Sequence, residues 1–188
     1  MPRAGRGWVV RTAAFVLAIH AASIAGAQDY YESFVSPMYI RGVWNDQPIL
    51  ATTGKNQVVL DYETATFRIS FDPSDLRTGI ALVDSALATQ RNHPVVITGK
   101  FQGVNTLQTR DHPPTDYKVE GRLADGSLSR SYTGKARMEH IFAGRYACLL
   151  DIDFTVPVKD MGVERLFPGL TGNLTFYIRQ SLLKRATD

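Results

Sequence analysis

The side chains best suited to metal binding or acid–base chemistry are the histidines beyond residue 27, and their spacing favours neither function. They are His93, His112 and His140, and none lies two or four residues from another. Zinc sites usually take at least two ligands that are close in sequence, so this spacing predicts no metal site. A serine and Asp84 would complete a hydrolytic triad with one histidine, but no Gly-x-Ser-x-Gly pattern is present. We therefore expect a protein that is not an enzyme and that needs no cofactor.

Two further features with chemical potential lie close together near the C-terminal end. Asp151 and Asp153 are two residues apart, so on a β-strand they share a face and could act as a carboxylate pair. A solvated outer face is the simpler interpretation of the same spacing. Cys148 is the only cysteine, which excludes an internal disulfide. Because Cys148 shares the apolar side of this stretch with Tyr146 and Leu150, we expect a buried, inert thiol.

These residues belong to the clearest structural pattern of the chain, which runs from Arg145 to Val156. Alternation with a period of two predicts one long strand with an apolar face, because successive side chains of a strand point to opposite sides. The apolar positions are Tyr146, Cys148, Leu150, Ile152, Phe154 and Val156. A strand of this length, about twice the usual 5 to 6 residues, suits a coiled or closed antiparallel sheet.

The first 27 residues have the composition of a secretory signal peptide. Arg3, Arg6 and Arg11 precede an apolar run, and Ala25-Gly26-Ala27 fits a cleavage site. We expect export, most simply to the periplasm, without stable membrane insertion, because the apolar run is shorter than a spanning helix requires. Removing three of the 21 basic residues leaves 18 against 18 acidic ones. The basic pI is therefore no argument for nucleic-acid binding.

The remaining residues, 28–188, suit a single domain. After an irregular lead-in from Asp29 to Pro37, the pattern predicts eight strands and one short helix from Gly79 to Arg91, which follows the third strand. The strands are Met38 to Trp44, Gln57 to Tyr62, Thr66 to Phe71, Pro94 to Phe101, Asp116 to Ala124, Ser127 to Glu139, Arg145 to Val156 and Gly172 to Gln180. Hairpin-length connections favour an all-β fold, an antiparallel eight-stranded β-barrel.

A barrel of eight strands is just wide enough to fill itself with side chains or to hold one small ligand. The inward candidates for a ligand-binding lumen are Phe67, Ile69, Phe71, Val95, Ile97, Tyr117, Val119, Tyr146, Leu150, Ile152, Phe154 and Phe176. The small inward residues Gly121, Gly134 and Ala136 would favour a cavity, and large residues opposite them would favour a filled core. A polar loop from Arg110 to Asp116 is a candidate for the mouth of such a lumen.

From Thr66 onward the chain resembles the YceI-like family of secreted bacterial proteins. The resemblance rests on Phe71-Asp72-Pro73-Ser74-Asp75-Leu76-Arg77-Thr78-Gly79, on Asp84 and Leu87, on His93-Pro94-Val95-Val96-Ile97, and on Tyr117-Lys118-Val119-Glu120-Gly121-Arg122-Leu123. Val83 and Ala86 stand where the family has arginine and often histidine, so the chain resembles a divergent member.

This resemblance implies an extended lipocalin-like barrel, typically periplasmic, that binds an isoprenoid or another amphiphilic chain in its lumen. It implies no catalytic residue. Two functions follow as alternatives. The protein either holds an apolar chain such as an isoprenoid, a quinone tail or a fatty acid, or it is a structural or protein-interaction module with a filled barrel. The oligomeric state is left open by both.

Overall fold

The computed structural model describes residues 30–104, 113–125, 128–143, 146–161, 163 and 166–186. In this part of the chain, ten antiparallel strands form one sheet with two short α-helices beside it, and neither helix could span a membrane. The strands are β1 (Tyr30–Val35), β2 (Met38–Trp44), β3 (Gln47–Thr53), β4 (Gln57–Asp61), β5 (Thr66–Phe71), β6 (Val95–Gln102), β7 (Thr115–Asp125), β8 (Leu128–Ala143), β9 (Tyr146–Pro157) and β10 (Leu170–Arg185). The expected signal peptide at residues 1–27 lies outside the described residues.

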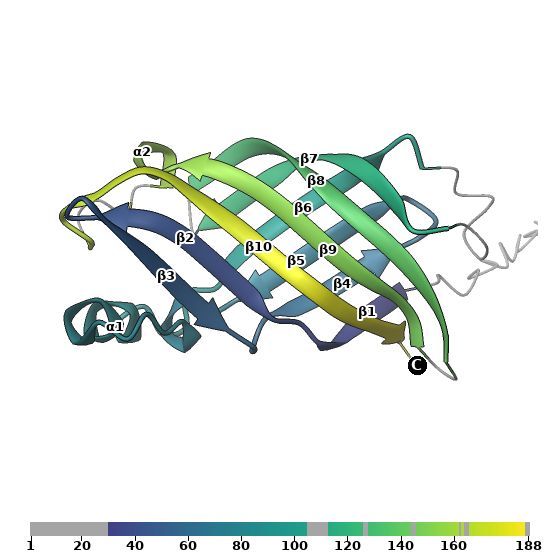
Figure 1. Cartoon of the computed structure of the whole chain (residues 1–188), viewed down its shortest axis with the longest axis horizontal. Helices are drawn as coiled ribbons and strands as arrows, with labels where there is room; N and C mark the ends of the chain where they lie inside the picture. Colours follow the sequence, from purple (N-terminus) through teal and green to yellow (C-terminus); the bar gives the residue numbers. More distant parts are fainter. Residues whose placement is uncertain are drawn as a thin grey trace, which may run out of the picture.

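Eight of the strands close into a barrel (Figure 1). They follow one another around the ring in the order β1, β4, β5, β6, β7, β8, β9, β10, and β10 pairs back with β1. The expected all-β antiparallel barrel of eight strands is therefore confirmed. Helix α1 (Ala81–Ala88) also lies in the predicted segment, between β5 and β6.

Strand β10 closes the ring because it is long enough to pair with two strands along one edge. Its first half pairs with β2, and its last residues pair with β1. Ser36 and Pro37 connect β1 to β2 and belong to neither strand. At the corresponding level β10 has a bulge between Ile178 and Ser181. The β2–β3 hairpin therefore extends the wall of the barrel on one side, beyond the closed ring.

Two strands lie in segments where the sequence pattern predicted none. The expected irregular lead-in from Asp29 to Pro37 contains β1, whose aromatic residues do not alternate with polar ones. Strand β3 contains Pro48 and is an edge strand, where proline is tolerated. The turn before it is formed by Asn45 and Asp46, both with positive φ (50° and 59°), as a two-residue hairpin requires.

The long alternating strand is confirmed as β9. Leu150, Ile152 and Phe154 are buried on the inner face, and Cys148 is also fully buried, as expected. Asp151 and Asp153 lie on the outer face and are half-buried. The inner face of the sheet, together with side chains of α1 and α2 (Val158–Met161), forms one continuous apolar core.

Candidate functional site

An apolar pocket of about 120 Å³ lies at the end of the barrel that carries both helices. Its wall is formed by β2, β3, β10, α1 and the segment between β9 and β10. The apolar lining residues include Ile40, Trp44, Ile49, Ala51, Phe71, Leu76, Val83, Leu87, Val95, Met161, Phe167, Leu174 and Phe176. Apolar side chains dominate the lining of this opening, and we take it as the candidate ligand site.

The volume of the pocket sets the length of chain that it accommodates in this conformation. An engineered apolar cavity of roughly 150 Å³ is known to bind benzene, so about 120 Å³ corresponds to about five carbon atoms. Each buried methylene contributes roughly 0.8 kcal/mol, whereas micromolar affinity requires about 8 kcal/mol. A tightly bound chain therefore has to extend beyond the pocket as it stands.

The polar residues that line the pocket are Thr78, Gln90 and His93. Thr78 is already engaged, because its hydroxyl donates to a carboxylate oxygen of Asp84 over 2.7 Å. The Gln90 side-chain amide donates to the hydroxyl of Thr89. His93 is exposed at the rim. The lining thus offers an apolar interior with few polar groups, which suits hydrocarbon.

The helix that covers one side of the pocket is oriented by Asp84. Its carboxylate accepts hydrogen bonds from the Thr78 amide and hydroxyl, both at 2.7 Å, and from the Gly79 amide at 3.3 Å. The Thr78 hydrogen bond is the main reason why the pKa of Asp84 lies below its ordinary value. With its first turn held in this way, α1 directs Val83 and Leu87 into the pocket.

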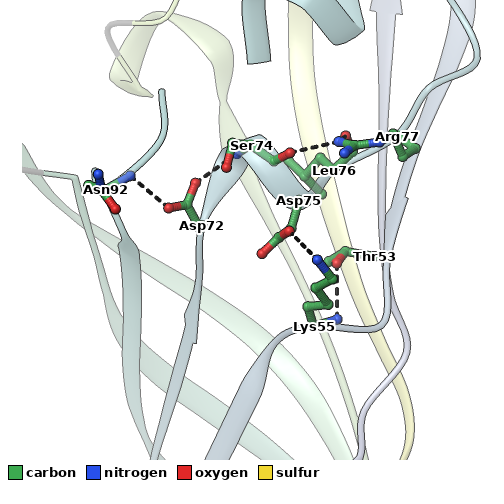
Figure 2. A network of polar contacts seen from close by, with 8 residues as sticks. All are labelled: Thr53, Lys55, Asp72, Ser74, Asp75, Leu76, Arg77 and Asn92. Carbon is green, nitrogen blue, oxygen red and sulfur yellow. Dashed lines mark hydrogen bonds and ion pairs between the residues drawn. The ribbon is translucent and has the colours of Figure 1, made fainter. Parts of the chain in front are cut away.

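A second polar network holds the segment between β5 and α1 against the barrel. Figure 2 shows Asp72 between Ser74 and Asn92, whose backbone amides both donate to its carboxylate over 2.8 Å. Lys55, from the connection between β3 and β4, forms an ion pair with Asp75 at 2.8 Å. Asp72 precedes α1 and Asn92 follows it. The Asp72 carboxylate therefore connects the two ends of the segment that contains α1.

Three of the twelve residues predicted to line a lumen lie in the pocket wall: Phe71, Val95 and Phe176. Deeper in the barrel lie Phe67, Ile69, Ile97, Val119, Leu150, Ile152 and Phe154, all buried in the core. Tyr117 is half-buried at the edge of this core. Tyr146 belongs to β9, but its side chain is outside the described residues. A ligand-binding role for these residues stays a prediction.

The middle of the barrel is filled by stacked aromatic rings. The Tyr132 and Phe154 ring centroids are 4.3 Å apart, and those of Phe154 and Phe176 are 4.7 Å apart and nearly parallel. A Cβ atom at Gly121 would lie 2.1 Å from the Thr98 carbonyl oxygen and 2.6 Å from the Tyr132 hydroxyl oxygen. One at Gly134 would lie 2.2 Å from the Asp153 carbonyl oxygen and 2.9 Å from the Phe154 Cβ. These two glycines therefore make room for the backbone of the neighbouring strands and for large side chains.

The polar loop that the sequence predicted at the mouth starts at the end of the barrel opposite to this pocket. Strand β6 starts at Val95, in the pocket wall, and runs away from it to Gln102, where the loop begins. Eight residues of strand span roughly 25 Å, so the loop starts at the far end of the barrel. Residues 105–112 of the loop lie outside the described part of the chain.

The Asp151 and Asp153 carboxylates do not act as a pair. Asp153 forms a bidentate ion pair with Arg179, and Asp151 accepts a hydrogen bond from the backbone amide of Gln180. Both carboxylates therefore connect β9 to β10 on the outer face. The interpretation as a simply solvated face was incomplete, because the pairing partner Arg179 is distant in sequence.

The sequence pattern missed the pocket residues contributed by β3 and by the segment before β10. Ile49 and Ala51 belong to the strand that was not predicted, and Phe167 to a segment without periodicity. Val83 and Leu87 stood at helical spacing, four residues apart, which was the one available signal for the α1 side of the site.

No protein-family model matches the sequence, and no curated protein matches it. Among solved structures, the chain is similar to a polyisoprenoid binding domain from Saccharophagus degradans that is described as implicated in plant cell wall breakdown. The TM-score is 0.63 at 9% sequence identity, over 84% of this chain and 98% of the other. At this level of identity the likeness shows the fold alone, so the two chains share a lipocalin-like antiparallel β-barrel.

Proposed function

We propose that the protein is a non-enzymatic binding protein that holds an apolar or amphiphilic chain, entering the barrel beneath α1. The observation that carries this proposal is the pocket itself, an opening at one end of the barrel whose lining is apolar apart from Thr78, Gln90 and His93. Concave apolar sites of this kind, in the mouth of a β-barrel, are typical of ligand binding. Isoprenoids, quinone tails and fatty acids all have the required chemistry.

The resemblance to the YceI-like family supports the same function, and we propose that the chain is a divergent member. The motif segment from Phe71 to Gly79 forms the end of β5, the 3₁₀ helix at Pro73–Asp75 and the approach to α1. Leu76 and Thr78 of this segment line the pocket. This segment of the resemblance therefore contributes to the cover of the candidate site. The solved polyisoprenoid binding domain with the same fold agrees with this interpretation.

We further propose that the protein works outside the cytoplasm, most simply in the periplasm, after cleavage behind Ala27. Strand β1 starts at Tyr30 and pairs with both β4 and β10. A cut after residue 27 would leave this strand whole, so the proposed cleavage is compatible with closure of the barrel.

The competing function is a protein-interaction module with a filled barrel. It is favoured by the Tyr132–Phe154–Phe176 stack, which occupies the middle of the barrel. The two proposals predict different results when the purified protein is extracted with organic solvent. A chain-binding protein purified from its own host should release a lipid into organic solvent, detectable by mass spectrometry, whereas a filled barrel should release none.

Two neighbouring substitutions on β3 test the pocket directly. Ala51 lines the pocket, so Ala51→Phe fills it and is expected to lower the affinity for a fluorescent fatty-acid analogue at least tenfold. Leu50 points outward with 45% of its surface exposed, and Leu50→Phe should leave the affinity unchanged. Equal affinity of both variants and the wild type would place binding elsewhere.

A further inference from the structure

Three polar side chains, Ser36, Asn56 and Ser181, are buried among the apolar residues of the barrel interior. Ser36 lies at the break between β1 and β2, Asn56 immediately precedes β4, and Ser181 follows the bulge of β10. Their exposed fractions are 2%, 7% and 0%. Each continues the inward-facing positions of its strand, since Met38, Val58 and Leu183, two residues further along, are fully buried as well. We call these three residues the inner polar cluster.

The inner polar cluster is hydrogen-bonded within itself but is not satisfied. The Asn56 Nδ2 atom donates to the Ser36 Oγ over 2.7 Å, and the hydroxyls of Ser36 and Ser181 bond to each other. The Asn56 Oδ1 atom is buried without a hydrogen-bond partner in the described part of the chain. An unsatisfied buried acceptor destabilises the folded state, so the position needs an explanation.

The cluster can be placed relative to the pocket wall through β2 and through the pairing of β4 with β5. Ile40 of β2 lines the pocket, and Ser36 lies four residues before it, with Met38 between them. Gln57 pairs with Ser70, which places Asn56 beside Phe71, another pocket residue. Four residues of strand span about 13 Å. The unbranched, flexible side chain of Met38 is therefore the main group on β2 between the pocket and the cluster.

The polarity of the cluster selects the kind of group that it would bind. A half turn of the Asn56 amide exchanges its oxygen and nitrogen, and the atom without a partner is then a donor instead of an acceptor. A hydroxyl satisfies either orientation because it both donates and accepts.

A carboxylate would be a poor ligand for the cluster, because a buried charge needs a cation as its partner. The two cations nearest to the cluster in sequence, Lys55 and Arg179, form ion pairs with Asp75 and Asp153.

We propose that Ser36, Asn56 and Ser181 form a binding site for the terminal hydroxyl of an apolar chain, which enters through the pocket and displaces Met38. The proposal rests on the proposed function and specifies its ligand as a long-chain alcohol. It also accounts for affinity, since a chain that reaches the cluster buries more methylenes than the roughly five carbons that fit the pocket.

The test compares dodecanol, dodecane and dodecanoate as competitors of a solvatochromic dye bound to the wild type and to Asn56→Leu. The ratio of dodecane to dodecanol dissociation constants should fall about tenfold in Asn56→Leu, which is the loss of one hydrogen bond to an otherwise unsatisfied group. The affinity for dodecanoate should not depend on Asn56. Asn173→Leu, at an exposed asparagine of β10, is the matched control and should keep the wild-type ratio.

If Asn56→Leu kept the wild-type ratio of dissociation constants, the proposal would be overturned. Failure of the wild type to bind any of the three competitors would instead refute the proposed function. If Asn56→Leu does not fold, Asn56→Ser, which removes the amide but stays polar, takes its place in the same comparison. Thermal unfolding without ligand gives a second readout: a purely structural amide predicts a lower Tm for Asn56→Leu, and a ligand-binding one an equal or higher Tm.

Discussion

Cys148 shows how strongly the barrel interior changes the chemistry of a single side chain. It is fully buried on β9, and this burial raises the pKa of its thiol to about 11, although a hydrogen bond with Tyr62 acts in the opposite direction. The thiolate is the reactive form of cysteine, so this thiol is inert near neutral pH.

The raised pKa of Cys148 predicts a loss of stability at alkaline pH. A thiol whose pKa is higher in the folded state stabilises the fold below the unfolded value, near 9, and this contribution is lost as pH rises through about 11. Between pH 8 and pH 11 the free energy of unfolding should fall by about 2 kcal/mol more in the wild type than in Cys148→Ala. Denaturant titrations at both pH values measure the difference. Equal losses in the two proteins would contradict the burial of this thiol.

At the scale of the elements, regular alternation of apolar and polar residues predicted strands reliably, whereas the sequence pattern does not show which strands pair with each other. β9 was predictable because Leu150, Ile152 and Phe154 alternate with outward residues along one strand. β1 was not, because its place depends on the exposed edges of β4 and β10, which are distant in sequence. The pocket was equally hidden, since Ala51 and Phe167 meet only after α1 and the β2–β3 hairpin have docked.

Helix α1 provides a prediction at the same scale. Asp84→Ala removes the three hydrogen bonds that the Asp84 carboxylate accepts at the start of the helix. The free energy of unfolding should therefore fall by about 1–2 kcal/mol, and the rate of amide hydrogen exchange should rise most across residues 78–90. Ser85→Ala, at an exposed position of the same helix, is the control and should have little effect.

The pH dependence of this difference follows from the lowered pKa of Asp84. A carboxylate with a lowered pKa stabilises the fold above its ordinary value near 4, and this contribution is lost as pH falls through the lowered folded value. The stability difference between the wild type and Asp84→Ala should therefore shrink in acid. An Asp84→Ala protein with wild-type exchange rates would show that α1 is held by its apolar contacts alone.

At the scale of the whole molecule, the barrel combines a rigid, filled middle with an apolar opening at one end. The aromatic stack behind Phe176 limits the depth of any binding site in this conformation, whereas α1 and the β2–β3 hairpin surround the opening without belonging to the closed ring. Ligand entry would therefore require movement of these outer elements and of single side chains, while the hydrogen-bonded ring stays intact.

The closed ring depends on β1, a strand of six residues, and this dependence can be tested by truncation. A protein that starts at Gln28 keeps β1 and should unfold in one cooperative transition as a soluble species. One that starts at Ser36 lacks β1, so β4 and the end of β10 become unpaired edges, which are templates for association. It should elute as dimers or larger aggregates in size-exclusion chromatography and should have a lower Tm. If the shorter protein kept the elution volume of the longer one together with its Tm, β1 would be dispensable, and the eight-stranded ring would not be the unit that stabilises the fold.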